Sequence, residues 1–523
     1  MRAGSKRRRS GRPAPDRGSP GFAGAVMRPC RRGLACLLGL VVAISAIAAE
    51  PAAPPAVRVE VDAKAAGVAF PHFWERMFGS GHAVLALRAD YRHDLDMVKQ
   101  ATDFTYVRAH GILDGEVGVF EVGEDGKPVY NFSYVDQIYD GLLAAGVKPY
   151  VELSFMPPDL DSHPDAAKPF FYKLRASPPK SYVLWDGLIK AFAQHLVDRY
   201  GIDEVSSWYF EVWNEPDIAF WNGKPAQATY FKLYDHTARD LKSVSPRLRV
   251  GGPSTSAIAW LPEFLRHVHE KNVPVDFVST HAYGNVCPDV KKARKQVDAS
   301  PYPHLPLILS EFNASAFNRP AITDTAYMGP YLAKVIHDCA GHVDAMSFWT
   351  FSDVFEEQGV VKTPFYGGFG LIAERGIPKP AFNAFAMLHK LGDTRLPAGD
   401  GPVLATRRED GTLVLALWNY APPVSDKTVY VPGAPKGESM QVEVDVANLD
   451  GDGTATVWRL DRGHGDVIPA FDAMGRPAYP SMSQIETLRK AGRMAPPENV
   501  AVRNGKLSLG IPPQGLVVVE LPR

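Results

Sequence analysis

Two glutamates stand at the ends of apolar runs in this sequence. Glu215 follows Asn214 at the end of the aromatic run in "WYFEVWNEPD" (residues 208–217), and Glu311 follows "LPLIL" (residues 305–309). A buried carboxylate is costly unless it is hydrogen-bonded or used. Two carboxylates directed into one cavity could supply the acid and the nucleophile of glycoside hydrolysis.

The two carboxyl groups would need different protonation states. One must hold a proton at working pH and give it to the leaving oxygen, while the other must be ionised to attack the anomeric carbon. Our hypothesis is that Glu215 is the acid/base and Glu311 the nucleophile. Retention of configuration then requires carboxyl groups about 5 to 5.5 Å apart.

A repeated strand-and-helix pattern explains how the two glutamates could meet. Eight short apolar runs alternate with helical patterns between about residues 70 and 390, which predicts a (β/α)8 barrel. Active sites lie at the C-terminal ends of barrel strands, so the polar residues that end the runs are the candidates. They are His110, Glu152, Asn214, Glu215, His281, Tyr283, Glu311 and Trp349, with Asp353, Glu356 and Glu357 after the last run.

The pattern changes after about residue 395 to closely spaced alternating runs such as "MQVEVDVANL" and "LVVVEL". Period-2 alternation with Gly, Pro and Asp between the runs indicates an all-β sandwich. The predicted fold class is therefore α/β, with a (β/α)8 TIM barrel over 67–392 and a C-terminal β-sandwich over 393–523. Val57, Val59 and Val61 alternate in the same way, so residues 49–66 should supply an N-terminal strand that joins the β domain.

The N-terminal residues read as a targeting segment. Residues 27–48 have a basic front, an apolar run and the small residues Ala46-Ile47-Ala48, which is typical of a secretory signal peptide cleaved near Ala48. The run is short for a membrane anchor, which remains the alternative. Residues 1–26 read as a basic disordered leader or an over-long gene start. We expect a periplasmic or secreted protein.

The composition and charge of the chain exclude some classes of binding partner. The chain has 523 residues, of which 46% are hydrophobic and 22% charged, as in a folded protein. Its formal net charge is −1, but the first 49 residues contain ten Lys/Arg and only Asp16, so the remainder is clearly acidic. This argues against nucleic acid and, after signal cleavage, against an anionic membrane as partner. Only Cys287 and Cys339 remain beyond the signal, and whether they pair is left open.

Seven blocks in order resemble glycoside hydrolase family 39, which contains β-xylosidases and α-L-iduronidases. The blocks are "YVRAHGILDGEVGVF", "YVELSFMPPDL", "EVWNEPDIAFWNG", "LRVGGP", "THAYG", "LILSEFNAS" and "FWTFSDVFEEQG". The resemblance implies a retaining hydrolase with Glu215 as proton donor and Glu311 as nucleophile. It also implies that Asn214 bonds the sugar 2-hydroxyl. The subsite would be lined by His110, His281, Tyr283, Trp349, Glu356 and Glu357, with Phe220 or Trp221 as a wall.

Each of these residues also has a structural interpretation. The two glutamates could form buried ion pairs, the histidines could be hydrogen-bonded core residues, and Asn214 and Tyr283 could cap strand ends. Glu356 and Glu357 could be a solvated loop pair. Glu152 lies inside its strand, where it could form an ion pair, for example with Arg108, or contact sugar, so we leave it out of the catalytic set. No HExxH or His-Asp-His spacing occurs, and we expect neither metal nor cofactor.

The resulting expectation is an exo-acting β-xylosidase that removes xylose from the non-reducing end of xylo-oligosaccharides or related small glycosides. Acidic residues in "DVFEEQG" would repel a uronate, which favours a neutral sugar over iduronate. Arabinose and glucose remain alternatives. Outside enzymes, the alternative is a non-catalytic carbohydrate-binding protein. The oligomeric state and the preferred chain length are left open.

Overall fold

The structure is a computed structural model and describes residues 56–166, 168–318, 321–421, 436–449 and 451–522. The predicted leader (1–26) and signal peptide (27–48) lie outside the described residues. Among the described residues, no helix is both long and apolar enough to cross a membrane.

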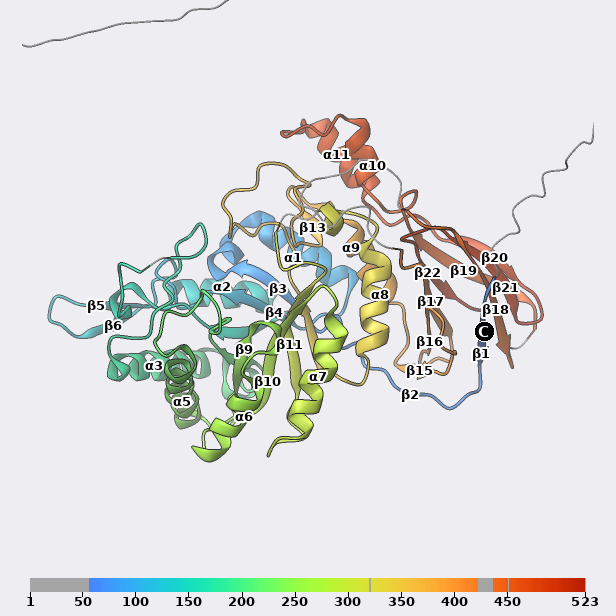
Figure 1. The fold of residues 1–523 in the computed structure, drawn as a ribbon. Coiled ribbons are helices and arrows are strands. Elements are labelled where there is room, and N and C mark those ends of the chain that lie inside the picture. Colours follow the sequence, from blue (N-terminus) through green and yellow to red (C-terminus); the bar gives the residue numbers. More distant parts are fainter. Residues whose placement is uncertain (1–55, 167, 319–320, 422–435, 450, 523) are drawn as a thin grey trace, which may run out of the picture. The chain divides into compact units, whose positions relative to one another are not determined.

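Eight parallel strands form a closed barrel at the centre of the ribbon in Figure 1, which confirms the predicted TIM-like barrel. The closing pair joins Ser347 to Met77 and Phe348 to Phe78. The strands are β3 (Met77–His82), β4 (Tyr106–His110), β7 (Lys148–Leu153), β8 (Tyr209–Val212), β9 (Arg249–Thr255), β10 (Phe277–Tyr283), β11 (Leu307–Asn313) and β12 (Ala345–Phe348).

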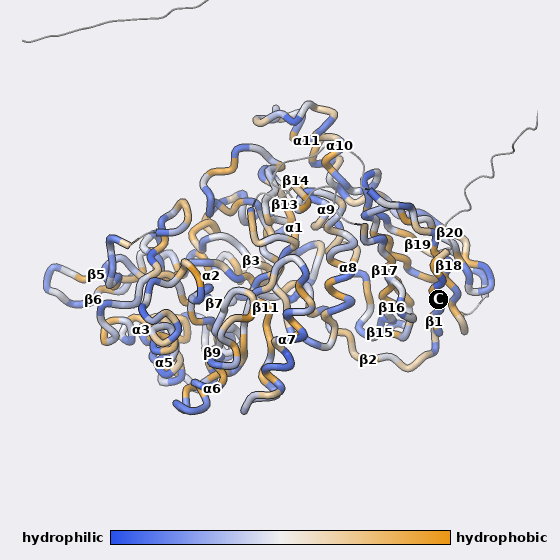
Figure 2. The backbone as a smooth tube through the Cα atoms, viewed as in Figure 1, coloured by the Kyte–Doolittle hydropathy of each residue, from blue (hydrophilic) through white to orange (hydrophobic). Residues whose placement is uncertain are grey.

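Helices follow the barrel strands and bury the faces that their apolar spacing predicts. In α3, Trp185, Leu188, Ile189, Phe192 and Leu196 recur at helical spacing, and all five are buried. Figure 2 shows the same change between hydrophilic and hydrophobic residues along α7. The helices of this region are α1 (Ala89–Ala101), α2 (Ser133–Ala144), α3 (Tyr182–Tyr200), α4 (Ile202–Val205), α5 (Ala226–Val244), α6 (Leu261–Glu270), α7 (Val286–Asp298), α8 (Met328–Cys339) and α9 (Pro380–Leu388).

In the sequence, the Ser-x-x-acid spacings of Ser133 with Asp136 and of Ser483 with Glu486 predict two capping boxes, and neither prediction is correct. Ser133 is already the first residue of α2, and no side chain caps that helix. In α11 (Met482–Ala491) the capping box uses Ser481 and Gln484, two residues before the Ser483 and Glu486 that the sequence suggested. In α11 the two registers, Ser481 with Gln484 and Ser483 with Glu486, overlap in the sequence, and only the backbone selects one.

The barrel interior is divided into an apolar end and a polar end. Met77, Tyr106, Tyr150 and Phe277 pack with Ile308 and Ala345 in a cluster near the beginnings of the strands. The charged residues Arg108, Glu152 and Glu211 lie further along their strands and are fully buried. The apolar plug therefore closes one end, and the polar groups gather toward the C-terminal ends of the strands, as in other barrels.

Two further sheets lie outside the barrel. The larger contains β2 (Val68–Ala69), β15 (Thr394–Leu396), β16 (Val403–Arg407), β17 (Leu413–Trp418), β22 (Leu516–Glu520), β19 (Gly453–Leu460) and β20 (Glu498–Val502). The smaller contains β1 (Val57–Asp62), β18 (Met440–Ala447) and β21 (Lys506–Ile511). Alternate residues of both sheets, among them Val59, Val444, Leu415 and Val519, share one hydrophobic cluster. The first described strand, β1, pairs in parallel with β18 from Val57↔Val442 to Asp62↔Ala447.

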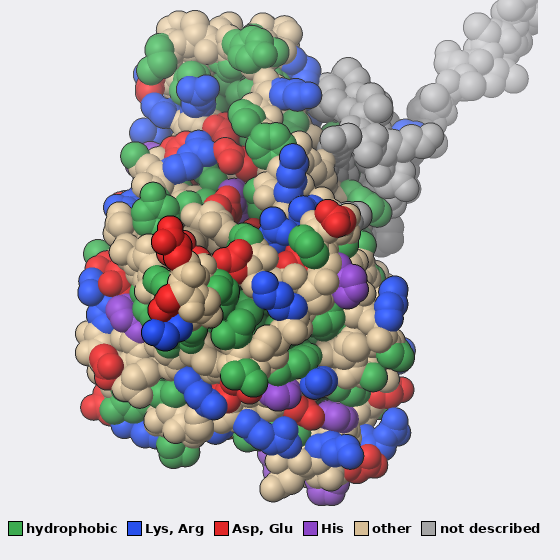
Figure 3. Space-filling view, turned by 90° about the vertical axis from the view of Figure 1, so that its left-hand side faces the viewer, with side chains coloured by type: hydrophobic (Ala, Val, Ile, Leu, Met, Phe, Trp, Pro, Cys, Tyr) green, Lys and Arg blue, Asp and Glu red, His purple; other side chains and the backbone are tan. Residues whose placement is uncertain are grey.

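Helices α8 and α9 connect the barrel to the larger sheet, since α8 contacts β17 and β22 and α9 contacts β19 and β22. A disulfide joins Cys287 in α7 to Cys339 in α8, which answers the pairing question that the sequence left open. Two hairpins pair β5 (Phe120–Val122) with β6 (Pro128–Tyr130) and β13 (Ile372–Ala373) with β14 (Ile377–Pro378), and α10 (Ile468–Ala473) precedes α11. The described part of the chain also contains four short 3-10 helices, η1 (Ala83–Leu87), η2 (Pro158–Leu160), η3 (Ser256–Ile258) and η4 (Ala321–Asp324). On the face shown in Figure 3, acidic and basic side chains are interspersed.

Candidate active site

A cavity of about 440 Å³ lies at the C-terminal ends of the barrel strands. Its volume falls in the range of small-molecule sites. Eight residues singled out from the sequence line it: His110, Asn214, Glu215, Phe220, Tyr283, Glu311, Trp349 and Glu357. Residues far apart in the chain are therefore brought together as the barrel topology requires.

Glu215 is held at a turn with an unusual backbone. The strand β8 ends at Val212, and Trp213 and Glu215 then adopt positive φ values of 73° and 40°. Such conformations cost energy in residues other than glycine, and they cluster at functional sites. The turn is fixed by the Trp213 indole, which donates to Phe220 O over 2.8 Å, and by the Glu215 N–H, which donates to Ser254 O over 2.8 Å.

The surroundings of Glu215 favour its protonated form. Burial, helped by the charge of Asp217, raises the pKa of this carboxyl to about 7, although His110 and Arg108 oppose the shift. His281 lies with Nδ1 2.9 Å from Glu215 Oε1, and burial lowers the pKa of this imidazole. A carboxyl with a pKa near neutrality can hold a proton and still release it, which is what a general acid/base requires.

Glu311 is surrounded by hydrogen-bond donors. Arg108 donates through Nη1 to Oε1 over 2.7 Å, and the Tyr283 hydroxyl donates to Oε2 over 2.5 Å. Burial raises the pKa of Glu311 above its ordinary value, but the charges of His281 and Arg108 act in the opposite direction. Donors to both oxygens stabilise the carboxylate form, which is the form that can attack a carbon atom.

The two carboxyl groups are close enough to act on one bond. An oxygen of Glu215, an oxygen of Glu311 and a nitrogen of His281 all lie within 4.8 Å of one another. Retaining enzymes place their carboxyl groups about 5 to 5.5 Å apart, whereas inverting enzymes need about 6.5 to 9.5 Å to admit a water molecule. The short spacing agrees with direct attack by Glu311.

Arg108, at the centre of β4, organises the site and was not among the predicted site residues. Its side chain is fully buried and reaches Glu211, Glu152 and Glu311 at 2.6, 2.7 and 2.7 Å. Its Nη2 also donates to Asn214 Oδ1 over 2.9 Å. Glu152 therefore forms the internal ion pair considered from the sequence. The available signal was a single arginine in the apolar run "FTYVRAHG".

His110 presents a positive charge to the cavity. Burial disfavours this charge, but Glu152, 2.8 Å from Nδ1, and Glu357, 3.5 Å from Nε2, raise the pKa of His110 to about 10. The ring packs against Trp349 with centroids 4.7 Å apart. Gly79 makes room for Trp349, because a Cβ at that position would lie 2.1 Å from the indole ring.

Two predicted site residues do not line the cavity. His281 is buried behind it and acts on Glu215 through the contact described above. Glu356 forms an ion pair with Arg88 and lies 3.8 Å from His82 Nε2. Its neighbour Glu357 does line the cavity. Glu356 has a positive φ of 63° and Glu357 begins a turn, so the two side chains point in different directions and only Glu357 reaches the site.

Several cavity residues come from loops in which the sequence offered no periodic signal. Phe170 packs on Phe220 with ring centroids 4.9 Å apart and forms a wall with it. Ile218 and Phe317 stand at the rim and expose 43% and 74% of their surface. An apolar rim around a polar floor can contact the less polar faces of a sugar ring while the floor binds hydroxyl groups.

Comparison with known proteins agrees with this geometry. Residues 57–505 match the model of "Glycosyl hydrolases family 39". A β-xylosidase from Geobacillus stearothermophilus is 38% identical over 84% of this chain and 90% of its own length. A β-xylosidase from Caldicellulosiruptor saccharolyticus is 35% identical over 86% of this chain and 95% of its own. The crystal structure of a monomeric β-xylosidase from Caulobacter crescentus CB15 superposes with a TM-score of 0.83 at 34% identity, and covers 89% of this chain and 99% of that one.

Proposed function

The chain belongs to the family 39 glycosyl hydrolases, and from that membership we propose that it is a retaining β-xylosidase that releases xylose from the non-reducing end of xylo-oligosaccharides. The observation that carries the proposal is the Glu215–Glu311 pair, whose carboxyl oxygens lie within 4.8 Å of each other on the floor of the cavity. The environments of the two groups differ as their two roles demand.

In the first step, Glu311 attacks the anomeric carbon and forms a glycosyl ester. The bond to the leaving oxygen breaks at the same time, and Glu215 gives that oxygen its proton. Arg108 and Tyr283 hold the attacking carboxylate in place. The leaving group departs as a neutral alcohol, so no alkoxide has to form.

In the second step, Glu215 acts as a base. It takes a proton from a water molecule whose oxygen attacks the anomeric carbon, and Glu311 leaves as a carboxylate. Both carboxyl groups return to their starting states, and two inversions give net retention. Asn214 is oriented by Arg108 through its Oδ1, which fixes the amide so that Nδ2 can donate to the sugar 2-hydroxyl.

The charge of the cavity favours a neutral sugar. The described residues that line it include Glu357 and Asp289 but neither lysine nor arginine. The cationic His110 also lines it, but Glu152 and Glu357 already pair with its two ring nitrogens. Arg108 lies beneath the floor, where three carboxylates already neutralise it. A uronate would need a free cation to offset its desolvation. Xylose, arabinose and glucose meet no such penalty, and the close relatives named above favour xylose.

The test is a panel of nitrophenyl glycosides: β-xyloside, β-glucoside, α-L-arabinoside and α-L-iduronide. We expect the highest kcat/KM on the β-xyloside and almost no activity in Glu311→Gly. Glu215→Ala should retain turnover on substrates with good leaving groups and be partly rescued by azide. NMR of the first-formed product should show the β-anomer. Inverted product, or no turnover on any of the four substrates, would contradict the proposal; the second result would favour the non-catalytic alternative.

Three further assignments complete the proposal. The two sheets that share a core form an accessory β-sandwich domain over residues 393–523, completed by the strand within 49–66. The protein is directed to the periplasm or the medium by the segment 27–48, which mass spectrometry of the mature N-terminus would test. Its partner is a small glycoside rather than nucleic acid or membrane.

A further inference from the structure

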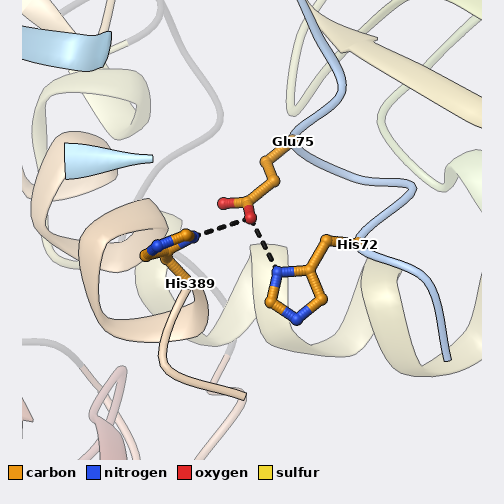
Figure 4. A group of neighbouring side chains, drawn as sticks. All are labelled: His72, Glu75 and His389. Atoms are coloured by element: carbon orange, nitrogen blue, oxygen red, sulfur yellow. Dashed lines mark hydrogen bonds and ion pairs between the residues drawn. The ribbon is translucent and has the colours of Figure 1, made fainter. Parts of the chain in front are cut away.

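Three potential metal ligands converge at the opposite end of the barrel from the active site. His72 and Glu75 lie in the segment before β3, and His389 follows α9. Figure 4 shows both imidazole rings directed at a single oxygen of Glu75. The Nδ1 atoms of His72 and His389 lie 2.7 and 2.8 Å from that oxygen, Oε1. Glu75 is only 2% exposed, whereas His72 and His389 are 19% and 33% exposed.

A second contact orients one of the rings. His72 Nε2 lies 3.1 Å from the carbonyl oxygen of Leu391, which can only accept a hydrogen. In the neutral ring this places the hydrogen on Nε2 and a lone pair on Nδ1, facing the Glu75 carboxylate. Metal-binding histidines in proteins are usually oriented in this way, with the other ring nitrogen donating to a carbonyl or carboxylate. Two acceptors facing each other require a positive charge between them.

The surroundings of Glu75 strengthen this requirement. Its second oxygen, Oε2, is buried and has no hydrogen-bond partner among the described residues. Among the described residues, Glu75 forms ion pairs with His72 and His389 and with no lysine or arginine. His389 is the C-cap of α9, where the helix dipole favours a cation.

We propose that His72, Glu75 and His389 bind a divalent transition-metal ion, of which Zn²⁺ is the best match. Two imidazoles and one carboxylate form a common zinc ligand set, with water in the remaining position. The exposed edge of His389 gives solvent access for that water. Glu75 Oε2 would be available as a second carboxylate contact.

From the position of the site, we expect a bound ion to affect the stability of the fold and not catalysis. Glu75 precedes the first barrel strand, and His389 precedes β15 of the larger sheet. A bound ion would therefore tie the start of the barrel to the segment that leaves it. Catalysis takes place at the other ends of the strands, so the ion should leave kcat and KM unchanged.

The experiment is a Zn²⁺ titration of the tag-free mature chain after treatment with EDTA, followed by calorimetry and by thermal unfolding. We expect one ion per chain and a rise in Tm of about 2 to 5 °C at saturation. His389→Ala and His72→Gln should each weaken binding by about 100-fold or more. The exposed His304 provides a matched control, and His304→Ala should bind like the wild type. Co²⁺ substitution should give a visible spectrum that is lost in His389→Ala.

The catalytic cluster of Glu215, His281 and Glu311 could also attract metal, so Glu311→Gln serves as a second control. Retained one-to-one binding in Glu311→Gln, with unchanged kcat/KM in His389→Ala, would support the site. Binding that is lost in Glu311→Gln, or that persists in His72→Gln/His389→Ala, would overturn it. So would the absence of any Zn²⁺ effect on Tm, which would mean that protons alone supply the positive charge. None of these results depends on which sugar the enzyme hydrolyses.

Discussion

Arg108 donates through Nη1 to Oε1 of Glu311 over 2.7 Å, from a position where its guanidinium is fully buried. The same group also holds Asn214 through Nη2. One side chain thus positions both the attacking carboxylate and the amide assigned to the sugar 2-hydroxyl. Arg108 is therefore a positioning residue for two separate parts of the mechanism.

Arg108→Lys should lower kcat/KM by about 100-fold or more. A lysine ammonium cannot reproduce the planar contacts to several carboxylates at once, so Glu311 would lose its fixed orientation and part of its stabilisation as an anion. The acid limb of the pH profile should then move to higher pH. The measurement is kcat/KM against pH well below Tm, with circular dichroism to confirm folding. An unchanged acid limb would argue against this role for Arg108.

The pH dependence of kcat/KM should be bell-shaped, with an alkaline midpoint near 7. Glu215 must be protonated to act as the acid, and burial raises its pKa to about 7, so activity falls as the pH rises through that value. Glu311 must be ionised, so activity also falls at low pH. His110, with a pKa of about 10, stays charged throughout. In Glu215→Ala, a substrate with a good leaving group should show no alkaline limb near 7; a limb that persists there would assign it to another residue.

Glu215→Gln should stabilise the fold at high pH. Glu215 has a higher pKa in the folded chain than its ordinary 4.5, so it stabilises the fold at low pH, and that contribution is lost as the pH rises through about 7. Above pH 8 the uncharged glutamine avoids burying a carboxylate, and the gain in unfolding free energy should be roughly 1 to 3 kcal/mol. Chemical denaturation at pH 4.5 and pH 8.5 measures it. Equal effects at both pH values would contradict the assignment.

Substitutions of Glu357 and Glu356 should differ in their effect on kcat/KM although the two residues are adjacent. Glu357 lines the cavity and pairs with His110, so Glu357→Gln should lower kcat/KM by about 10- to 100-fold, mainly through a weaker hydrogen bond to the sugar. Glu356 pairs with Arg88 instead, and Glu356→Gln should change kcat/KM by less than about 3-fold. Kinetics of the two variants side by side provide the test. A larger loss in Glu356→Gln would restore its predicted place in the subsite.

Removal of the Cys287–Cys339 disulfide should affect stability and leave catalysis intact. The two cysteines are 52 positions apart in the sequence, and for a loop of this length the chain-entropy model gives about 4 kcal/mol. Cys287→Ala/Cys339→Ala should therefore unfold at a clearly lower denaturant concentration, with unchanged kcat/KM. The wild type under reducing conditions should match the double variant. If reduction has no effect on unfolding, the pairing is wrong.

The catalytic pair could be predicted because barrel topology constrains it. Once eight strand-and-helix units are recognised, any carboxylate near the C-terminal end of a strand must lie in the same region, whatever its distance in sequence. Glu215, three residues after β8 ends, and Glu311, two residues before β11 ends, satisfy this rule. Asn214 and Tyr283 satisfy it as well. The end of a predicted barrel strand therefore also predicts where the side chains at that end lie in the folded barrel.

Residues outside that rule were missed or placed wrongly. Arg108 stands inside an apolar run that was judged by its last polar residue, His110, and its long side chain carries the guanidinium to Glu311. Ile218 and Phe317 lie in loops, where no periodicity relates a side chain to the cavity. Glu356 and Glu357 differ by the path of one loop. In each case the answer depends on side-chain reach or loop direction, which strand and helix periods do not encode.

The parallel pairing of β1 with β18 has a consequence for synthesis. Val57 is made long before its partner Val442, and at about 5 to 20 residues per second the delay is roughly 20 to 80 seconds. During that interval Val59 and Val61 cannot be buried in their native core, because most of its other residues belong to later strands. The first described strand must therefore wait through translation of the entire barrel, and it joins the fold among the last.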